Sequence, residues 1–356
     1  MVLPAYFEND IHFAGGGDRY PYRLAQALRE HCDVTLVTFG RKRAEENLDG
    51  LKHFVLPVIS RSPDNPVAWP GYFLRHKFDL IHVHQVRSAV TSLLTVVAPI
   101  RRTPLVATDH GGGGPSLMYR LNLYSLISRF ILVSEFSRTL LPSGALERTT
   151  VIRGGIDTDR FAFSERPRQP RAIQVGRIMP HKGIEYLIEA AGSDIPVVVA
   201  GRVFDRDYYQ YLRRLSEGRP VTFLLDADDA AIRDLYASSA VTVAASVYRD
   251  QRGGYWPNSE LLGLTMLESM AVGTPVICTD VGGMPEYVVD GHVGYVVPPN
   301  DPATLRSKLL ELLSDPVRAS AMGAAGREHV KSYTWDRVAE AVAREYSHVV
   351  RGATAD

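Results

Sequence analysis

A short apolar run that gives way to an acidic residue, a histidine and glycines, PLVATDHGGGG (residues 104–114), sets the pattern of this chain. Runs of the same kind recur along the first half of the sequence and are separated by amphipathic segments. Apolar, β-branched runs that alternate with helical segments are typical of parallel strands joined by crossover helices. The other runs in this half are VTLVTF (34–39), DLIHVH (79–84), RFILVS (129–134) and TTVIRG (149–154).

The same alternation starts again after residue 171. The sequence therefore predicts the α/β fold class, with two doubly wound, Rossmann-like domains whose strand ends face a central cleft. The stretch at about 164–171 is rich in Pro and Arg and lacks periodicity, so we expect a linker there. The expected domains are 1–165 and 166–335, followed by a helix and tail at 336–356. The second series of runs is AIQVGR (172–177), IPVVVAG (195–201), VTFLL (221–225), AVTVAAS (240–246) and TPVICTD (274–280).

The composition excludes several classes of protein. Of the 356 residues 45% are hydrophobic, and basic and acidic side chains balance at 40 each, so no overall field attracts nucleic acid. The two cysteines, Cys32 and Cys278, fit neither a metal-binding spacing nor a disulfide scaffold. The start lacks a leader pattern, and the apolar stretch 93–100 is too short to span a bilayer. We expect a cytoplasmic protein with no transmembrane segment, and we leave peripheral membrane contact and oligomeric state open.

Two carboxylates lie in the apolar stretch SELLGLTMLESMAVGTPV (259–276). Helical periodicity begins near Thr265, so residues 263–265 are expected at a helix N-terminus, where free amides and the helix dipole attract phosphate. Glu268 either completes a capping box with Thr265 or holds a ribose diol. Glu260 lies in the preceding loop and has no capping task, which makes it a candidate to accept hydrogen bonds from sugar hydroxyls.

Basic residues follow the first strand of the second domain in VGRIMPHKG (175–183). Arg177 and Lys182 project from a strand-to-helix loop, where cations can hold a diphosphate leaving group without a metal ion. The alternative is that both are ordinary solvated side chains. Their position at the carboxyl end of a strand favours the functional interpretation.

The first domain offers a glycine-rich loop and three histidines. Gly15 and Gly16 open the first helix and allow a backbone to approach phosphate, although the pattern is not G-x-G-x-x-G. His110 follows a strand and is a candidate for the active site, with a structural role as the alternative. His82 and His84 alternate along a strand; we expect them on opposite faces, so that at most one reaches the site.

Acidic triplets at 157–159, 205–207 and 226–228 each resemble half of a metal site. Such triplets arise readily in loops, and Asp157 is better explained as a turn former. We therefore expect no metal site at these positions.

In chain order, these segments resemble a known family. The stretch 259–301 resembles the E-x7-E region of the retaining glycosyltransferase family four, which has the two-domain GT-B fold. VGRIMPHKG resembles the G-R-x4-K-G segment of that family, and VIRGGIDTDRF (151–161) resembles its N-G-V-D-x3-F turn. AGGGDRYPYRLAQAL (14–28) resembles its N-terminal Gly-Gly loop and helix.

The resemblance implies a retaining glycosyltransferase that moves a sugar from a nucleotide diphosphate sugar to a hydroxyl acceptor without a metal or other cofactor. Glu260 would bind the donor sugar, and Glu268 its ribose. The C-terminal helix would cross back to pack on the N-terminal domain. The implied catalytic residues are His110, Arg177, Lys182 and Glu260. The implied donor-binding residues are Gly15, Gly16, Gly263, Leu264, Thr265 and Glu268.

Three features depart from the family pattern: the start at Met1, almost inside the first strand; four glycines after His110; and a long, aromatic loop at 247–259. In that loop Tyr255 and Trp256 either line a sugar or acceptor site or form a packed lid. The acceptor is left open between a small metabolite, a lipid carrier and a polysaccharide.

Other functions remain as alternatives: a nucleotide-sugar epimerase or a non-catalytic nucleotide-sugar binding protein on the same architecture. A nicotinamide-dependent oxidoreductase is disfavoured, since no G-x-G-x-x-G follows the first strand.

Overall fold

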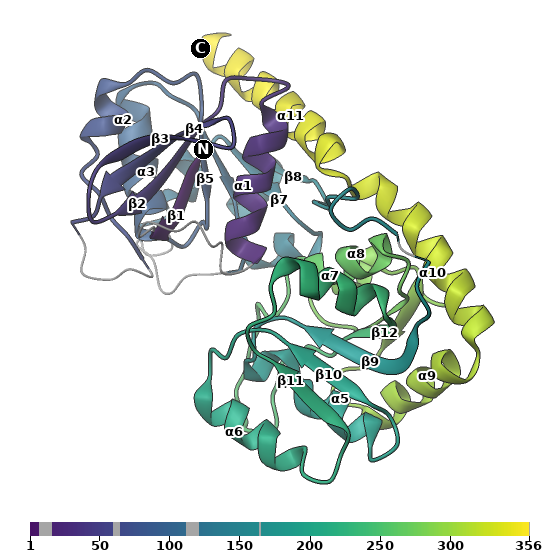
Figure 1. Cartoon of the computed structure of the whole chain (residues 1–356). Coiled ribbons are helices and arrows are strands. Elements are labelled where there is room, and N and C mark those ends of the chain that lie inside the picture. Colours follow the sequence, from purple (N-terminus) through teal and green to yellow (C-terminus); the bar gives the residue numbers. More distant parts are fainter. Residues whose placement is uncertain (7–15, 60–64, 112–120, 164, 356) are drawn as a thin grey trace. The chain divides into compact units, whose positions relative to one another are not determined.

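The structure, a computed structural model, describes residues 1–6, 16–59, 65–111, 121–163 and 165–355. The chain divides into two compact units. Unit 1 comprises Met1–Gly155 and Trp335–Asp356, and unit 2 comprises Ile156–Thr334. Each unit is built on its own sheet (Figure 1), so the predicted fold class of two α/β domains is confirmed.

The sheet of unit 1 has the strand order β3-β4-β2-β1-β5-β6-β7-β8. All neighbouring strands are parallel except β3 and β4, which are antiparallel. Pairing of β5 with β6 aligns His84 with Thr108, which places the chain after both strands at the same edge of the sheet. The strands are β1 (Val2–Tyr6), β2 (Thr35–Gly40), β3 (Ala44–Leu48), β4 (Leu51–Pro57), β5 (Ile81–His84), β6 (Leu105–Thr108), β7 (Arg129–Leu132) and β8 (Thr149–Val151).

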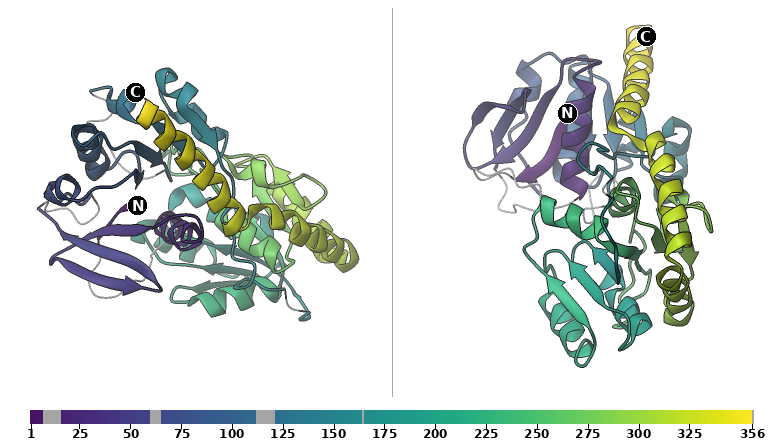
Figure 2. Two further views of the ribbon diagram at one scale, coloured as in Figure 1. Left: turned by 90° about the horizontal axis from the view of Figure 1, so that it is seen from above. Right: turned by 45° about the vertical axis from the view of Figure 1, so that its right-hand side comes forward.

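The helices of unit 1 include one that comes from the far end of the sequence. Helix α11 (Trp335–Ala355) packs on α1 (Gly16–Leu28), as Figures 1 and 2 show. Arg129 of β7 forms an ion pair with Glu345 of α11 at 2.7 Å. Among the described residues of unit 1, the other helices are α2 (Gly71–Arg75), α3 (Ala89–Ile100) and the short 3₁₀ segments η1 (Leu123–Leu126), η2 (Phe136–Leu140) and η3 (Ser143–Arg148).

The sheet of unit 2 is entirely parallel, with the order β11-β10-β9-β12-β13-β14. Strand β10 shows why the runs of this half are continuously apolar. Val197 and Val199 belong to one core cluster, and Val198 and Ala200 belong to another, because successive side chains face opposite sides of the sheet. The strands are β9 (Gln169–Val175), β10 (Val197–Ala200), β11 (Val221–Leu224), β12 (Ser239–Ala244), β13 (Val276–Thr279) and β14 (Gly294–Val297).

Helices cover both faces of this sheet. Leu187 of α5 and Leu309 of α9 pack in the first cluster, and Leu267 and Met270 of α8 pack in the second. The helices are α5 (Ile184–Ala191), α6 (Arg206–Leu215), α7 (Asp229–Ala237), α8 (Leu264–Ala271), α9 (Pro302–Ser314) and α10 (Pro316–Val330), with 3₁₀ segments η4 (Pro180–Lys182), η5 (Met284–Tyr287) and η6 (Lys331–Tyr333).

The boundary between the units lies earlier than the expected position at 165. Ile156 and Phe161 are buried in a core cluster of unit 2, and Ile156 bridges to Thr334 at the other end of that unit. Burial of these two apolar side chains in unit 2 therefore moves the boundary to 155/156.

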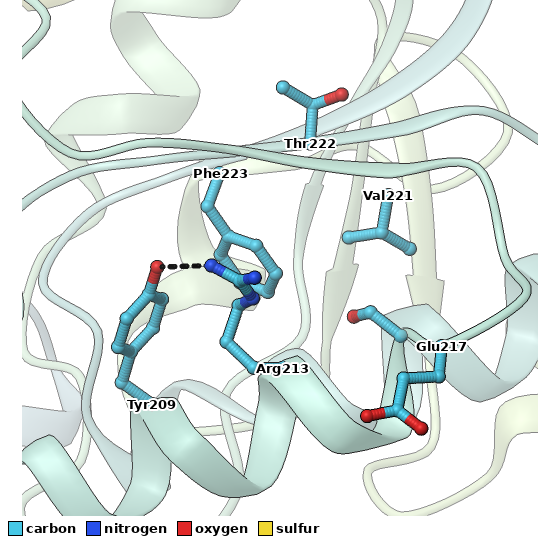
Figure 3. Close-up of a pocket in the computed structure, with 7 residues that line it drawn as sticks. Tyr209, Arg213, Glu217, Val221, Thr222 and Phe223 are labelled. Atoms are coloured by element: carbon cyan, nitrogen blue, oxygen red, sulfur yellow. Dashed lines mark hydrogen bonds between the residues drawn. The ribbon is translucent and has the colours of Figure 1, made fainter.

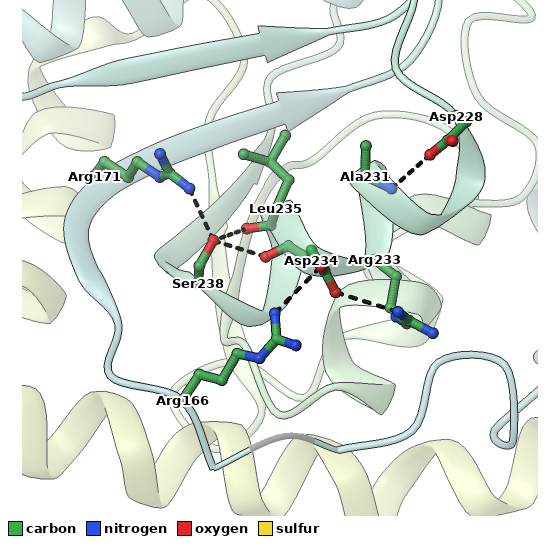
Figure 4. Close-up of polar contacts among 8 residues, drawn as sticks. All are labelled: Arg166, Arg171, Asp228, Ala231, Arg233, Asp234, Leu235 and Ser238. Atoms are coloured by element: carbon green, nitrogen blue, oxygen red, sulfur yellow. Dashed lines mark hydrogen bonds and ion pairs between the residues drawn. The ribbon is translucent and has the colours of Figure 1, made fainter.

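The segment expected to be a linker is bound to unit 2. Arg166 pairs with Asp234 of α7 at 3.2 Å, and Arg171 donates to the Ser238 hydroxyl at 2.8 Å (Figure 4). Arg168 donates to the Val272 carbonyl oxygen at 3.2 Å. The arginines therefore bind residues 166–171 to unit 2 instead of leaving them solvated as a linker. Strand β9 begins within this segment, at Gln169.

Three aspartates of the acidic triplets make local turns or caps. Asp205 caps α6 by accepting from the Tyr208 amide at 2.8 Å, and Asp228 caps α7 by accepting from the Ala231 amide at 2.8 Å (Figure 4). Asp157 accepts from the Arg160 amide at 2.9 Å, which is the predicted turn. In the described part of the chain, no cluster of three or more His, Cys, Asp or Glu side chains could hold a metal ion.

None of the helices in the described ranges is both long enough and apolar enough to cross a membrane.

Candidate active site

The loop after β9 packs closely against neighbouring backbone at a point where only a glycine fits. Gly183, between η4 and α5, has φ +58°, and a Cβ there would lie 2.0 Å from the Ala245 carbonyl oxygen, beyond the end of β12. Only glycine combines that conformation with so close an approach. The loop therefore brings the residues before Gly183 next to the chain that follows β12.

Replacing Gly183 with alanine should be strongly destabilising. We expect a loss of more than about 2 kcal/mol in the free energy of unfolding, because the left-handed conformation and the collision with Ala245 add. Gly218 is a matched control: its φ is +74°, but an added Cβ meets nothing within 4 Å. Gly218→Ala should cost about 1 kcal/mol. Urea unfolding measures both, and equal losses would contradict the close packing at Gly183.

Lys182 and Glu260 form an ion pair at this point. The Lys182 ammonium contacts the Glu260 carboxylate, and their side chains are only 19% and 14% exposed. The Ser246 hydroxyl donates to Glu260 Oε1 at 2.9 Å. Both residues come from segments that follow the carboxyl ends of adjacent strands, β9 and β12, so two separate predicted motifs meet here.

The carboxylate of Glu260 stays ionised despite its burial. Desolvation alone would raise its pKa, but the positive charge of Lys182, with hydrogen bonds from Lys182 and Ser246, outweighs desolvation and lowers the pKa below the usual 4.5. The main chain of Glu260 is also fixed, since its carbonyl oxygen accepts from the Gly283 amide at 2.9 Å. A Cβ on Gly282 would lie 1.8 Å from that oxygen.

Acid should weaken the protein through Glu260. A lowered folded pKa means that the ion pair stabilises fully above the unfolded value near 4.5 and that this contribution disappears as the pH falls through the folded pKa. Glu260→Gln has no such titration. We expect the difference in unfolding free energy between wild type and Glu260→Gln to shrink as the pH is lowered from about 6 to about 3. A difference that stays constant over that range would show that Glu260 is not held ionised.

Helix α8 begins at Leu264, and Gly263 is its N-cap. No side chain caps this end, so the capping box between Thr265 and Glu268 is wrong. Glu268 instead accepts from the Tyr236 hydroxyl at 3.1 Å. The first amides of a helix have no partner within the helix, and without a capping side chain they are suited to an anion.

The other cation of the loop is less enclosed. Arg177 is exposed, and its guanidinium lies 5.5 Å from the centre of the Phe204 ring. The structure brings Lys182 and Glu260 into contact but shows no contact of Arg177 with either, within the described residues. Because Arg177 is exposed on the same loop as Lys182, a ligand bound over this loop could contact its guanidinium.

Sequence patterns did not identify His181 and Asp250. His181 is buried against Trp256, with ring centres 5.3 Å apart, and burial with the nearby Lys182 charge lowers its pKa to about 4. Asp250 accepts from the Trp256 indole N–H at 2.7 Å and from the Gly254 amide at 2.9 Å. The aromatic loop is thus packed at Trp256, whereas Tyr255 is 59% exposed.

In unit 1, His110 follows β6 and is hydrogen-bonded to His84, with 3.0 Å between His110 Nε2 and His84 Nδ1. The expectation that His82 and His84 face opposite sides is wrong. Their ring centres are 4.3 Å apart, because residues two positions apart in a strand share a face. Of the two glycines predicted at the first helix, Gly16 is the first residue of α1, and Gly15 lies outside the described residues.

A surface pocket of about 400 Å³ lies elsewhere in unit 2 (Figure 3). It is lined by residues of α6, of β11 and of the turn between them, among them Phe223 and Arg213, whose guanidinium donates to the Tyr209 hydroxyl at 3.4 Å. None of the candidate site residues lines it, so we assign it no part in the chemistry.

Comparison with known proteins identifies the family. Residues 155–329 match the family described as glycosyl transferases group 1, and residues 14–160 match glycosyltransferase family 4. The chain belongs to glycosyltransferase family 4. Both matches together span most of the glycosyltransferase, and the resemblance noted in the sequence is confirmed.

Curated relatives are similar over much of the length. Phosphatidyl-myo-inositol mannosyltransferase of Mycobacterium leprae is 27% identical over 292 residues, which cover 76% of this glycosyltransferase and 74% of the relative. A sulfoquinovosyl transferase of Arabidopsis thaliana is 26% identical over 348 residues, covering 86% of this chain and 66% of the relative.

Solved structures share the fold of this glycosyltransferase. Sucrose-phosphate synthase from Thermosynechococcus elongatus superimposes with a TM-score of 0.74 at 20% identity, over 99% of this chain and 100% of that one. HepE of Anabaena, in complex with UDP and glucose, gives a TM-score of 0.75 at 18% identity, over 98% and 100% of the two chains. At such identities the likeness concerns the two-domain GT-B fold.

Proposed function

We propose that this glycosyltransferase moves a sugar from a nucleoside diphosphate sugar to a hydroxyl group and retains the anomeric configuration. The main support for the proposal is the largely buried ion pair of Lys182 and Glu260, on segments that follow the carboxyl ends of β9 and β12. Ligands of open α/β sheets bind beyond the carboxyl ends of the strands. Family membership and the nucleotide in the HepE structure support the same class of donor.

The diphosphate requires positive charge, because it is already anionic in the donor and one further negative charge develops on it when the sugar leaves. Lys182 provides one cation, and its ammonium has donors beyond the one that Glu260 engages. Arg177 on the same loop provides a second. The uncapped first turn of α8, with the amides of Leu264 and Thr265, provides main-chain donors.

The two glutamates suit the sugars at the two ends of such a donor. Glu260 is ionised and can accept hydrogen bonds from two hydroxyls of the transferred sugar. Glu268 lies one helical turn after the amides of α8, where it can accept from the two ribose hydroxyls. From the family resemblance we further propose that His110 of unit 1 contacts the transferred sugar and that Gly15 and Gly16 act near the phosphate and the acceptor.

The reaction is proposed to need no metal ion, since protein cations and main-chain amides supply the charge. Turnover measured with EDTA in excess should equal turnover without it. A loss of activity that Mg²⁺ or Mn²⁺ restores would contradict this part of the proposal.

The proposed reaction is tested by incubating the protein with UDP-, GDP-, ADP- and TDP-sugars and candidate acceptors. Inositol phosphates belong in the acceptor panel, because one relative is a D-inositol 3-phosphate glycosyltransferase. Proton NMR of the product identifies the new anomeric bond. We expect transfer from one class of nucleotide with the configuration of the donor. A product of inverted configuration, or epimerised donor with no transfer, would contradict the proposal.

A further inference from the structure

Three histidines and two hydroxyl residues form one network in unit 1, in which His82, His84 and Thr108 are buried and His110 and Tyr346 are half-buried. His82 is held at both ring nitrogens, with Nδ1 2.6 Å from the Tyr346 hydroxyl of α11 and Nε2 2.8 Å from Thr108 Oγ1. The His82 ring lies beside the His84 ring, tilted by 33°, and His84 is hydrogen-bonded to His110. The network therefore links the C-terminal helix to the proposed active-site histidine.

The hydrogen bond between His84 and His110 contains one hydrogen. The nitrogen that carries this hydrogen determines the tautomer of both rings. Burial lowers the pKa of both histidines, that of His110 to about 3, so both rings are neutral and one nitrogen of each carries hydrogen. Either His84 Nδ1–H donates to His110 Nε2, or His110 Nε2–H donates to His84 Nδ1. The two arrangements present opposite hydrogen-bonding groups at the remaining nitrogen of His110.

The second nitrogen of His84 decides between them. His84 is completely buried, and its Nε2 has no hydrogen-bond partner within the described residues. If His110 donated, the hydrogen of His84 would sit on Nε2 as a buried N–H without an acceptor, a group that folded proteins avoid most strongly. If His84 donates through Nδ1–H, its Nε2 is unprotonated, and no buried N–H is left without an acceptor.

We propose that His84 is a positioning residue for His110, whose Nε2 accepts from His84 Nδ1–H so that His110 presents an Nδ1–H donor to its ligand. A fixed second partner sets both the tautomer and the orientation of a histidine. The His110 ring is further held by Tyr20, at 4.7 Å between ring centres, and Tyr20 packs on Trp335 at 5.0 Å. His110 then offers a sugar hydroxyl a neutral donor.

The tautomer is measured directly by proton–nitrogen NMR of ¹⁵N-histidine-labelled full-length protein. His53 is an internal standard: its Nδ1 lies 2.8 Å from Glu46 Oε1, and a carboxylate only accepts, so His53 carries its hydrogen on Nδ1. We expect His110 to show the His53 pattern. A hydrogen on His110 Nε2 would overturn the proposal, whether or not any variant folds.

The role in transfer rests on the proposed function and is tested by variants. His84→Leu removes the donor, whereas His84→Asn keeps an N–H near the position of Nδ1. We expect His84→Leu to lower kcat roughly ten- to a hundredfold with little change in donor KM, and His84→Asn to recover much of the loss. His53→Leu is the matched control, because it removes another buried, hydrogen-bonded histidine of unit 1.

The outcomes separate the two claims. Equal kcat values for His84→Leu and His53→Leu, or no recovery in His84→Asn, would overturn the positioning role. Absence of transfer from every nucleotide sugar, with His110 still showing hydrogen on Nδ1, would overturn the proposed function and leave the tautomer assignment standing.

Discussion

Replacing Lys182 with methionine is expected to lower kcat by roughly 10²- to 10³-fold while the protein stays folded. Methionine keeps an unbranched side chain of similar length, without the terminal ammonium, and so removes the enclosed positive charge that we assign to the leaving diphosphate. Loss of charge stabilisation affects the transition state most, because negative charge develops on the diphosphate as the sugar departs. Initial rates at saturating donor measure the effect, and circular dichroism checks the fold.

The matched control for Lys182 is Lys308→Met. Lys308 also pairs with a glutamate, at 2.9 Å from Glu311, and lies 4.3 Å from the centre of the Tyr295 ring. It lies on α9 and belongs to no part of the proposed site, so its removal should leave kcat unchanged. Similar rates in the two variants would show that Lys182 has no special part in transfer.

Replacing Glu260 with glutamine should reduce kcat/KM by at least about 10²-fold. The amide has nearly the same shape, but it accepts at one oxygen only and cannot neutralise Lys182. Two effects therefore combine: the sugar hydroxyls lose a charged acceptor, and the Lys182 ammonium loses its partner. Steady-state kinetics over a range of donor concentrations separates the change in kcat from the change in KM.

Glu311→Gln serves as the control for Glu260. Glu311 accepts from the Tyr295 hydroxyl at 2.6 Å and pairs with Lys308, so it resembles Glu260 in having a cation and a hydroxyl as partners. Its replacement should cost stability without affecting kcat/KM. Normal turnover by Glu260→Gln would remove Glu260 from the mechanism.

The fold was predictable because parallel strands leave a simple signature. Strand β10 is apolar on both faces, and such a run cannot be confused with a half-solvated strand. The boundary between the units was harder to predict from the sequence. Arginines usually mark solvent, and nothing in the pattern of residues 164–171 showed that Arg166 and Arg168 would find partners on unit 2.

The site was predictable where a role depends on a strand end. Lys182 and Glu260 lie 78 positions apart in sequence, yet both follow strand ends that parallel pairing brings together. The sequence did not reveal His181 and Asp250, because their contacts with Trp256 depend on packing, and packing leaves no periodic signal. The predicted opposite orientation of His82 and His84 is wrong, because residues two positions apart in a strand face the same side of the sheet.

We expect protein cations of unit 2, rather than a metal ion, to hold the diphosphate of the donor. Isothermal titration of wild type and Lys182→Met with UDP, GDP, ADP and TDP, all in EDTA, tests it most directly. We expect one nucleotide to bind wild type without metal and to bind Lys182→Met at least about tenfold more weakly. Equal affinity for both proteins, or binding that requires an added divalent cation, would contradict the claim.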